Sequence, residues 1–560
     1  MLKSYVLCAA VAMCLVTPAA AQQADVIRGR IAAEDGEIVA NADVRVTSVP
    51  SNVNKRAKTD KSGRYAVTFP NGEGDYWVSV SAIGFVPRRF EIKRVADEDI
   101  LVGDVTLARA AAVLDGVQVR ADRARASRNN SAPDISGTEK LVGNGAVDPS
   151  QAGNLAAMAA ALPGVQLIPG ADGNPDQFSV YGLSGDQNST TLNGLGFGGA
   201  DVPRDASTKS TLGTTPWDVS RGGFSGGQFG LRTQSGSNFS ARGMSSLLNA
   251  PALEWTDRAG RASGAEYSSF SLGASTAGPI VVDNSFYSAG YQLDRRYSDL
   301  QSLTSASPLA LQTAGVAVDS ATRFRNLLGR ARIPTSASRL PATRINDHGS
   351  FLAAFDVSPP SSTSGQSLNI TAAGTFSRLN SPFGQATAMP TVDGERTNWF
   401  GSLQARHTDY FGVGVLTETS VGISRMRGYT NPYLALPGGV VRVGSTLGDG
   451  STAISQLAFG GSPLQSASNT ATAVGAQNQL SWFSLNNEHR IKLTSELRVE
   501  RYEQSLAMNS LGTFSYNSLA DLEGGRPASF SRLLSPRFGR ESQVIAALSL
   551  GDSYRPTTDL

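Results

Sequence analysis

Long stretches in the second half of the chain alternate strictly between apolar and polar side chains. The apolar members of one such stretch fall at every second position: Leu368, Ile370, Ala372, Gly374 and Phe376. The same period recurs over 287–294 and over 491–499, where Lys492, Glu496 and Arg498 fall on the polar side. Because successive side chains of a β-strand point to opposite faces, each stretch predicts a strand with one apolar and one polar face. The charges exclude a buried sandwich interior, and the pattern is typical of membrane-barrel strands with apolar residues facing lipid.

The connections between these stretches alternate in length. Short ones fall at 278–284, 358–366, 410–412, 486–487 and 552–557, and long ones at 296–342, 380–396, 428–476 and 505–540. Outer-membrane barrels have short turns on the periplasmic side and long loops outside, whereas a soluble sandwich has no reason to separate the two lengths. Counting Ala252–Thr256 as the first, we expect about ten strands, each roughly 9–11 residues long.

The first 21 residues have the organisation of a secretory signal peptide. Lys3 supplies the positive start, Val6–Val16 is an apolar run too short to span a bilayer, and Ala19-Ala20-Ala21 gives an A-x-A cleavage site. We expect cleavage between Ala21 and Gln22. Both cysteines lie in this segment, so the mature chain is expected to carry neither disulfides nor thiolate metal ligands.

Composition narrows the class of protein further. The 49 basic residues nearly balance the 47 acidic ones, a net charge of +2, which argues against an electrostatic nucleic-acid binder. The mean hydropathy is −0.16, and no apolar run after the signal peptide approaches the length of about 18 residues that a spanning helix needs. An exported chain without such a helix can still enter a membrane as a closed barrel.

Short alternating strands separated by Gly, Asp and Asn turns occupy the region from 22 to 110 and predict a small β-sandwich. Val26–Ile31, Ala42–Val46, Arg64–Val67 and Tyr76–Val80 are its clearest strands. The order of its motifs resembles the carboxypeptidase regulatory-like domain: Gly29, Asp35-Gly36, Ala42-Val44-Val46, Thr59-Asp60, Gly63-Tyr65 and Gly84-Phe85. That resemblance implies no peptidase activity.

A compact α+β domain is expected over 148–240. Asp148-Pro149 can start a helix that runs through Ala-rich sequence to Leu162, where Pro163-Gly164 ends it. This helix and the motifs after it resemble, in order, the plug of TonB-dependent outer-membrane receptors: Phe178–Gly182, Asn188–Gly194, Arg221–Gly223 and Ser225–Gly227. Two positions depart from the family pattern, because Tyr181 replaces the usual Arg and Asn193 the usual Asp. The buried ion network of such plugs is therefore expected to be altered here.

Sandwich, plug and barrel together make a mainly β chain that resembles the Oar-like branch of TonB-dependent receptors. The closer match lies in Asp218–Gly227 and Tyr291–Arg296. Members of the family close a barrel of 22 strands around the plug, whereas 241–560 accounts for fewer than half of these. The chain also stops at Leu560 within an expected periplasmic turn, so we expect it to be truncated at its C-terminus and not to form a stable monomeric transporter alone.

A linker is expected over 111–147, and it begins with a short alternating stretch. The stretch consists of Leu114, Asp115, Gly116, Val117, Gln118 and Val119. Its position before the plug suggests the TonB box, which would pair with a TonB-type energy-transducing protein by adding a strand to a sheet edge. The alternative is a last strand of the sandwich.

The resemblance implies a receptor in the outer membrane that takes up an external ligand, with sandwich and plug on the periplasmic side. The ligand could be a peptide, a glycan or a metal chelate, and the other partners are TonB and outer-membrane lipid, with no nucleic acid. An alternative is a surface or adhesion protein that uses the barrel only as an anchor.

A secreted enzyme is the third possibility, but the sequence has no nucleophile elbow, metal motif or phosphate-binding loop. His348, His407 and His489 are far apart and are interpreted as ordinary strand or loop residues. We therefore expect no catalytic, cofactor or metal site.

Overall fold

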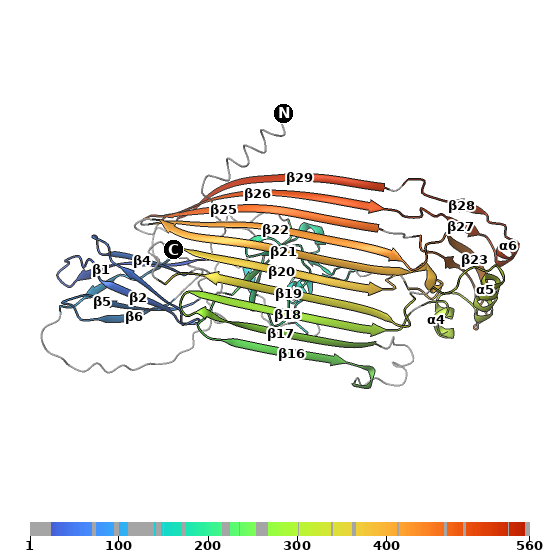
Figure 1. Cartoon of the computed structure of the whole chain (residues 1–560), viewed down its shortest axis with the longest axis horizontal. Coiled ribbons are helices and arrows are strands. Elements are labelled where there is room, and N and C mark those ends of the chain that lie inside the picture. Colours follow the sequence, from blue (N-terminus) through green and yellow to red (C-terminus); the bar gives the residue numbers. More distant parts are fainter. Residues whose placement is uncertain are drawn as a thin grey trace, which may run out of the picture.

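A computed structural model describes most of the chain. The described residues are 24–69, 74–93, 100–109, 139–141, 147–148, 151–170, 175–214, 225–234, 236–253, 267–300, 302–337, 340–360, 366–382, 384–411, 414–463, 467–484, 489–535 and 537–554. The fold is mainly β, with a small sandwich, an α+β plug and a large curved antiparallel sheet, as the sequence predicts (Figure 1).

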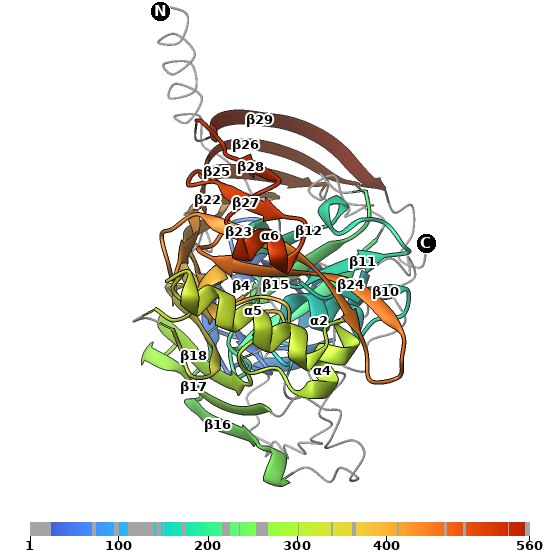
Figure 2. The same cartoon turned by 90° about the vertical axis from the view of Figure 1, so that its right-hand side faces the viewer.

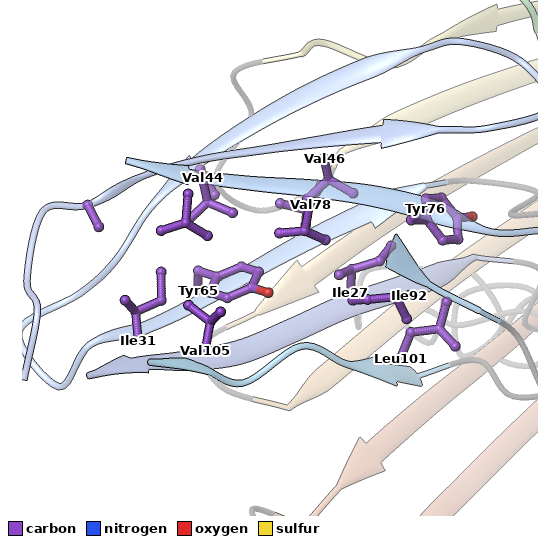
Figure 3. Close-up of a cluster of buried hydrophobic side chains, with 14 of the residues drawn as sticks. Ile27, Ile31, Val44, Val46, Tyr65, Tyr76, Val78, Ile92, Leu101 and Val105 are labelled. Carbon is purple, nitrogen blue, oxygen red and sulfur yellow. The ribbon is translucent and has the colours of Figure 1, made fainter. Parts of the chain in front are cut away.

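The sandwich has two sheets whose alternate side chains meet in one core. One sheet has the order β4-β1-β7 with β8 beside β1, and the other has the order β3-β2-β5-β6. The strands are β1 (Asp25–Ala33), β2 (Asp43–Ser48), β3 (Asn54–Lys58), β4 (Arg64–Phe69), β5 (Tyr76–Ser81), β6 (Arg88–Ile92), β7 (Ile100–Val102) and β8 (Val105–Leu107). Figure 3 shows Ile27, Val44, Tyr65 and Val78 pointing into the space between the sheets, and all four are buried. The strand β3 was not expected, since its sequence NKRAK is mostly polar.

The described part of the plug contains a short helix and two sheets. Its elements are β9 (Glu139–Leu141), α2 (Leu155–Ala160), β10 (Val165–Ile168), β11 (Gln177–Val180), η3 (Gly185–Gln187), β12 (Ser189–Leu192), β13 (Leu195–Gly196), β14 (Thr208–Gly213) and β15 (Gln228–Thr233). Strands β10 and β11 pair with each other, and the other five form a sheet in the order β13-β12-β15-β14-β9.

The predicted start of the plug helix at Asp148 is wrong. The helix α2 begins at Leu155, and its N-cap is Asn154, whose side-chain oxygen accepts a hydrogen bond from the Ala157 N–H at 3.0 Å. Gly153, just before this cap, has a φ of +101°, a left-handed conformation that ends helical geometry and favours glycine. The cap residue and this glycine, rather than the Asp-Pro pair, therefore set the first turn.

Ten antiparallel strands form the large sheet, which we call the wall. They are β16 (Ala241–Asn249), β17 (Tyr267–Val281), β18 (Ser285–Ser298), β19 (Arg344–Val357), β20 (Ser367–Asn380), β21 (Gly394–Phe411), β22 (Val415–Pro432), β25 (Ala467–Phe483), β26 (His489–Leu506) and β29 (Arg537–Tyr554). Each pairs with the next in this order, so that β16 and β29 lie at the two edges.

Two expectations about the wall need correction. The first strand is Ala241–Asn249, not Ala252–Thr256, and residues 251–253 form a 3₁₀ turn, η4 (Pro251–Leu253). The strands are also longer than expected, with 18 residues in β21, β22, β26 and β29. They continue past the apolar stretch into polar sequence at the long-loop end, where pairing between backbones no longer depends on an apolar face.

Short and long connections alternate as predicted, but the long ones are folded. Together they build what we call the cap, the described residues of 302–337, 384–393, 433–463 and 507–535. Its elements are α4 (Pro308–Thr313), α5 (Val318–Arg330), η5 (Pro390–Val392), β23 (Gly438–Thr446), β24 (Thr452–Gly460), β27 (Thr513–Tyr516), α6 (Leu519–Glu523) and β28 (Ser529–Ser531). The cap lies at the right-hand end of the wall in Figure 1, and the sandwich lies at the opposite end beside the short turns.

Candidate functional site: the plug against the inner wall

The plug lies on the concave side of the wall, as Figure 2 shows in a view along the strands. A shared core holds the two together, because Leu352, Ala373 and Phe400 of the wall pack with Val180, Phe229 and other buried plug residues. Phe400 meets Phe197 of the plug edge to face, with ring centroids 5.1 Å apart. This face of the wall is the one on which the sequence places the polar residues.

A chain of hydrogen bonds crosses from plug to wall through Asn193. The Asn193 side-chain oxygen accepts from the Thr233 N–H at 3.0 Å, and its amide donates to the Thr371 hydroxyl at 3.0 Å. Thr371 in turn donates to Asn369, whose amide donates to the Asp356 carboxylate at 2.7 Å. Asn193, Thr371 and Asn369 are all buried.

Asn193 sits at a tight turn between β12 and β13. It has a φ of +51° and Gly194 a φ of +89°, the left-handed pair that an Asn-Gly hairpin turn provides at low cost. An Asp at this position could accept the Thr233 bond but could not donate to Thr371. The Asn at position 193, where the resemblance leads one to expect Asp, therefore forms an uncharged hydrogen bond between the plug and Thr371 of the wall.

The second departure, Tyr181, lies on the plug surface. Its side chain is 65% exposed, and its ring packs against Gly164, where an added Cβ would come within 2.6 Å of a ring carbon. Its backbone N–H donates to the Gly164 carbonyl within the plug.

Buried charges line the wall below this link. Arg406 of β21 and Glu418 of β22 are buried on the inner face. They lie on neighbouring strands, since Arg406 pairs with Ser420 and Thr408 with Glu418. Opposite charges placed side by side offset part of the cost of removing each from water. The inner face thus carries a charge network of its own beside the plug.

A second contact lies nearer the cap. His348 of β19 lies 3.1 Å from the Asp201 carboxylate of the plug and 3.7 Å from Asp294 of β18. The backbone N–H of Arg204 donates to the Gln292 side chain at 2.8 Å. The interpretation of His348 as an ordinary strand residue did not foresee these neighbours, because strand pairing places it beside Asp294 and the position of the plug places it beside Asp201.

At the other end of the wall, the sandwich contacts the short turns. The Lys55 ammonium donates to the Thr68 carbonyl at 2.7 Å and to the Ser358 hydroxyl at 2.5 Å. Arg28 donates to the Ser484 carbonyl at 2.8 Å, and Phe286 of β18 is part of the sandwich core. Burial lowers the pKa of Lys55 to about 7, because no carboxylate among the described residues pairs with it.

Several predicted site residues lie outside the described residues. These are the cleavage site at Ala21 and Gln22, the TonB-box candidate Leu114–Val119, and the plug motif Arg221–Gly223. Within the described part of the chain there is no group of three or more His, Cys, Asp or Glu side chains placed to hold a metal ion. No helix in the described ranges combines the length and apolar character needed to cross a membrane.

Comparison with known proteins supports the assignment of the sandwich. The family model of the carboxypeptidase regulatory-like domain matches residues 26–108. The sandwich is a carboxypeptidase regulatory-like domain. No curated protein matches the sequence of the chain.

Several solved structures are similar to this chain over about three quarters of its length. The outer membrane transporter YddB from Escherichia coli superposes with a TM-score of 0.50 at 15% identity, covering 75% of this chain and 55% of that one. The siderophore receptor PirA from Acinetobacter baumannii gives 0.45 at 12% identity, with 76% and 55% covered. A mutant of the ferric enterobactin receptor PfeA from Pseudomonas aeruginosa gives 0.43 at 13%, with 75% and 55% covered. By the first of these superpositions, this chain shares the fold of the YddB structure. It spans about half the length of all three structures.

Proposed function

We propose that the chain is a TonB-dependent receptor of the outer membrane, which takes up an external ligand past its plug. The observation that supports this most strongly is the polar link between plug and wall. A plug held through hydrogen bonds and charges, rather than through a fully apolar interface, can separate from the wall with water replacing its partners. Pulling on the segment before the plug would then open a path along the inner wall.

The outer surface of the wall supports the same proposal. Apolar side chains such as Leu403, Ile423 and Leu550 are half or more exposed, on the face opposite the plug. Exposed apolar area of this extent is unusual for a soluble surface and suits contact with lipid. The cap would then face outward, and the regulatory-like domain would lie in the periplasm.

The TonB box at Leu114–Val119 remains part of the proposal. Substitution of Val117 by proline removes a backbone donor and prevents strand pairing at this point. We expect V117P to abolish energy-dependent growth on the transported nutrient while leaving the amount of protein in the outer membrane unchanged. The measurement compares cells that carry the full-length gene or the variant on panels of peptides, glycans and iron chelates.

The matched control is Ala126→Pro, which places the same residue in the linker outside the box. Growth of the V117P strain equal to that of the control would refute the assignment of the box. If the protein is only an anchor or an adhesion protein, removing the energy source of the membrane should leave the growth of both strains unchanged.

A further inference from the structure

The outer face of the wall changes abruptly from apolar to cationic on its last four strands. One register row consists of Ile423, Val474, Val499 and Val544, which pair side by side across β22, β25, β26 and β29. Two residues further toward the cap on each strand, the next outward row is Arg425, Thr472, Arg501 and Ser542. A row of branched aliphatic side chains is therefore followed directly by arginines and hydroxyls.

The row after that continues the pattern. It consists of Arg427, Thr470, Glu503 and Arg540 in the same pairing. We call Arg425, Arg427, Arg501 and Arg540 the arginine patch, and all four are exposed. Neighbouring strands are about 4.8 Å apart, and same-face residues on one strand about 7 Å apart. The patch is therefore about 15 Å wide, with small hydroxyl side chains between its arginines.

Among the described residues, the charges of the patch are not balanced. Glu503 pairs with Arg501 and with Arg540, each at 2.8 Å, and it is the single acid in these two rows. Arg425 and Arg427 have no ion pair among the described residues. Outward arginines on the earlier strands of the wall do have ion pairs: Arg295 pairs with Asp347, and Arg378 pairs with Glu395.

We propose that the arginine patch binds the phosphorylated headgroup of a lipid in the outer leaflet. The acyl chains of this lipid would lie against the aliphatic row of Ile423, Val474, Val499 and Val544. This inference rests on the proposed function, since it needs the wall to stand in a membrane with the cap outside. Guanidinium groups bind phosphate through paired, charge-assisted hydrogen bonds, and the threonine hydroxyls between them can donate to the same oxygens. The aliphatic row lies where the acyl chains of such a lipid would begin.

A phosphorylated glycolipid fits this surface better than free phosphate or an acidic protein. Free phosphate makes no use of the aliphatic row. A protein partner that covered the aliphatic row would have to enter the hydrocarbon layer of the membrane. A lipid supplies both parts of the contact, one for each set of rows.

The test uses protein expressed from the full-length gene, in nanodiscs of phosphatidylcholine that contain a small fraction of diphosphoryl lipid A. Native mass spectrometry counts the lipid A molecules retained by the unsubstituted chain and by the R425Q/R427Q variant. Loss of two phosphate-binding guanidinium groups is expected to weaken retention at least about tenfold. The control R332Q/R442Q removes the same charge from exposed arginines of the cap and is expected to retain lipid A normally.

Three results would overturn the proposal. Equal retention by R425Q/R427Q and the unsubstituted chain would show that the patch is not the lipid site. Equal loss in the control would show that overall charge, not position, matters, and complete displacement by inorganic phosphate would show a phosphate site without acyl contact. Heat-modifiable migration is measured in parallel: a chain that does not insert at all defeats the proposed function together with the lipid site, whereas the three results above defeat the lipid site alone.

Discussion

Lys55 shows how one residue can make contact between two domains depend on pH. It is 3% exposed, its ammonium lies 5.4 Å from the centre of the Phe69 ring, and it reaches Ser358 of the wall. Burial lowers its pKa to about 7, whereas an exposed lysine keeps its proton up to about pH 10.4. Between these values the opened state binds more protons than the closed state, so the closed state gains stability as pH rises.

We therefore expect the free energy of local opening at β3 to rise by up to about 1.4 kcal/mol per pH unit between pH 7 and 10. Hydrogen exchange of the β3 and β4 amides, corrected for intrinsic rates, measures it. In Lys55→Met the free energy of opening should no longer depend on pH. Lys58→Met, which changes an exposed lysine of the same strand, should keep this dependence. A slope of the same size in Lys55→Met would contradict this assignment.

Asn193 is the second residue whose role depends on a partner far along the chain. Replacing it with Asp removes the donor to Thr371 and brings a charge toward Asp356, at a cost of about 1–3 kcal/mol for a buried polar group left unpaired. We expect N193D and Thr371→Val each to speed exchange of the β12 and β13 amides. The double variant should cost less than the sum of the two, because both remove the same link. Strictly additive effects would show that the two residues do not act together.

At the scale of elements, the cap is one folded unit built from four loops. Its core contains Leu311 and Phe324 from the first loop, Met389 from the second, Val441 and Phe459 from the third, and Leu519 from the fourth. Because each loop buries its apolar residues only against the others, the loops are expected to order and disorder together.

Phe324 of α5 tests this dependence. It is fully buried and packs against Phe459, with ring centroids 5.7 Å apart. Truncation to alanine should destabilise the cap by about 3–5 kcal/mol and raise hydrogen exchange in β23 and β27 as well as in α5, with the wall unchanged. Asn326→Ala, on the exposed side of the same helix, serves as control. Loss of protection confined to α5 would mean that the loops fold independently.

At the scale of the whole molecule, the two ends of the wall are expected to face different compartments. The sandwich contacts the short turns through Arg28, Lys55 and Asn54, whose backbone N–H donates to the Asp283 carboxylate at 2.8 Å. In the full-length protein on intact cells, tags within 296–342 or 428–476 should be labelled by antibody. Tags at Ser361 or Asn487 should be labelled only after the outer membrane is opened. Labelling of the second pair alone would invert the topology.

The sequence by itself determined the features that repeat locally. Alternation at every second residue fixes which face of each strand is apolar, so the inward position of Asn369 and Lys492 and the outward position of Ile370 and Leu493 followed from period alone. The contrast between short and long connections, and the ordered motifs of the sandwich, are likewise properties of neighbouring residues. These features needed no knowledge of which strands pair.

Only the tertiary structure decided which distant residues meet. Asn193 and Thr371 are 178 positions apart, and Lys55 and Ser358 are 303 positions apart. Nothing in the local pattern around Asn193 or Lys55 marks a partner at such separation. The sequence likewise predicts four separate loops where the structure has one cap. None of these loops has an apolar face large enough to fold alone, so their shared core appears only when the four meet. The arginine patch also depends on strand register, because pairing places Arg425 and Arg501 on either side of Thr472 in one row. Both arginines lie on the surface that faces away from the plug.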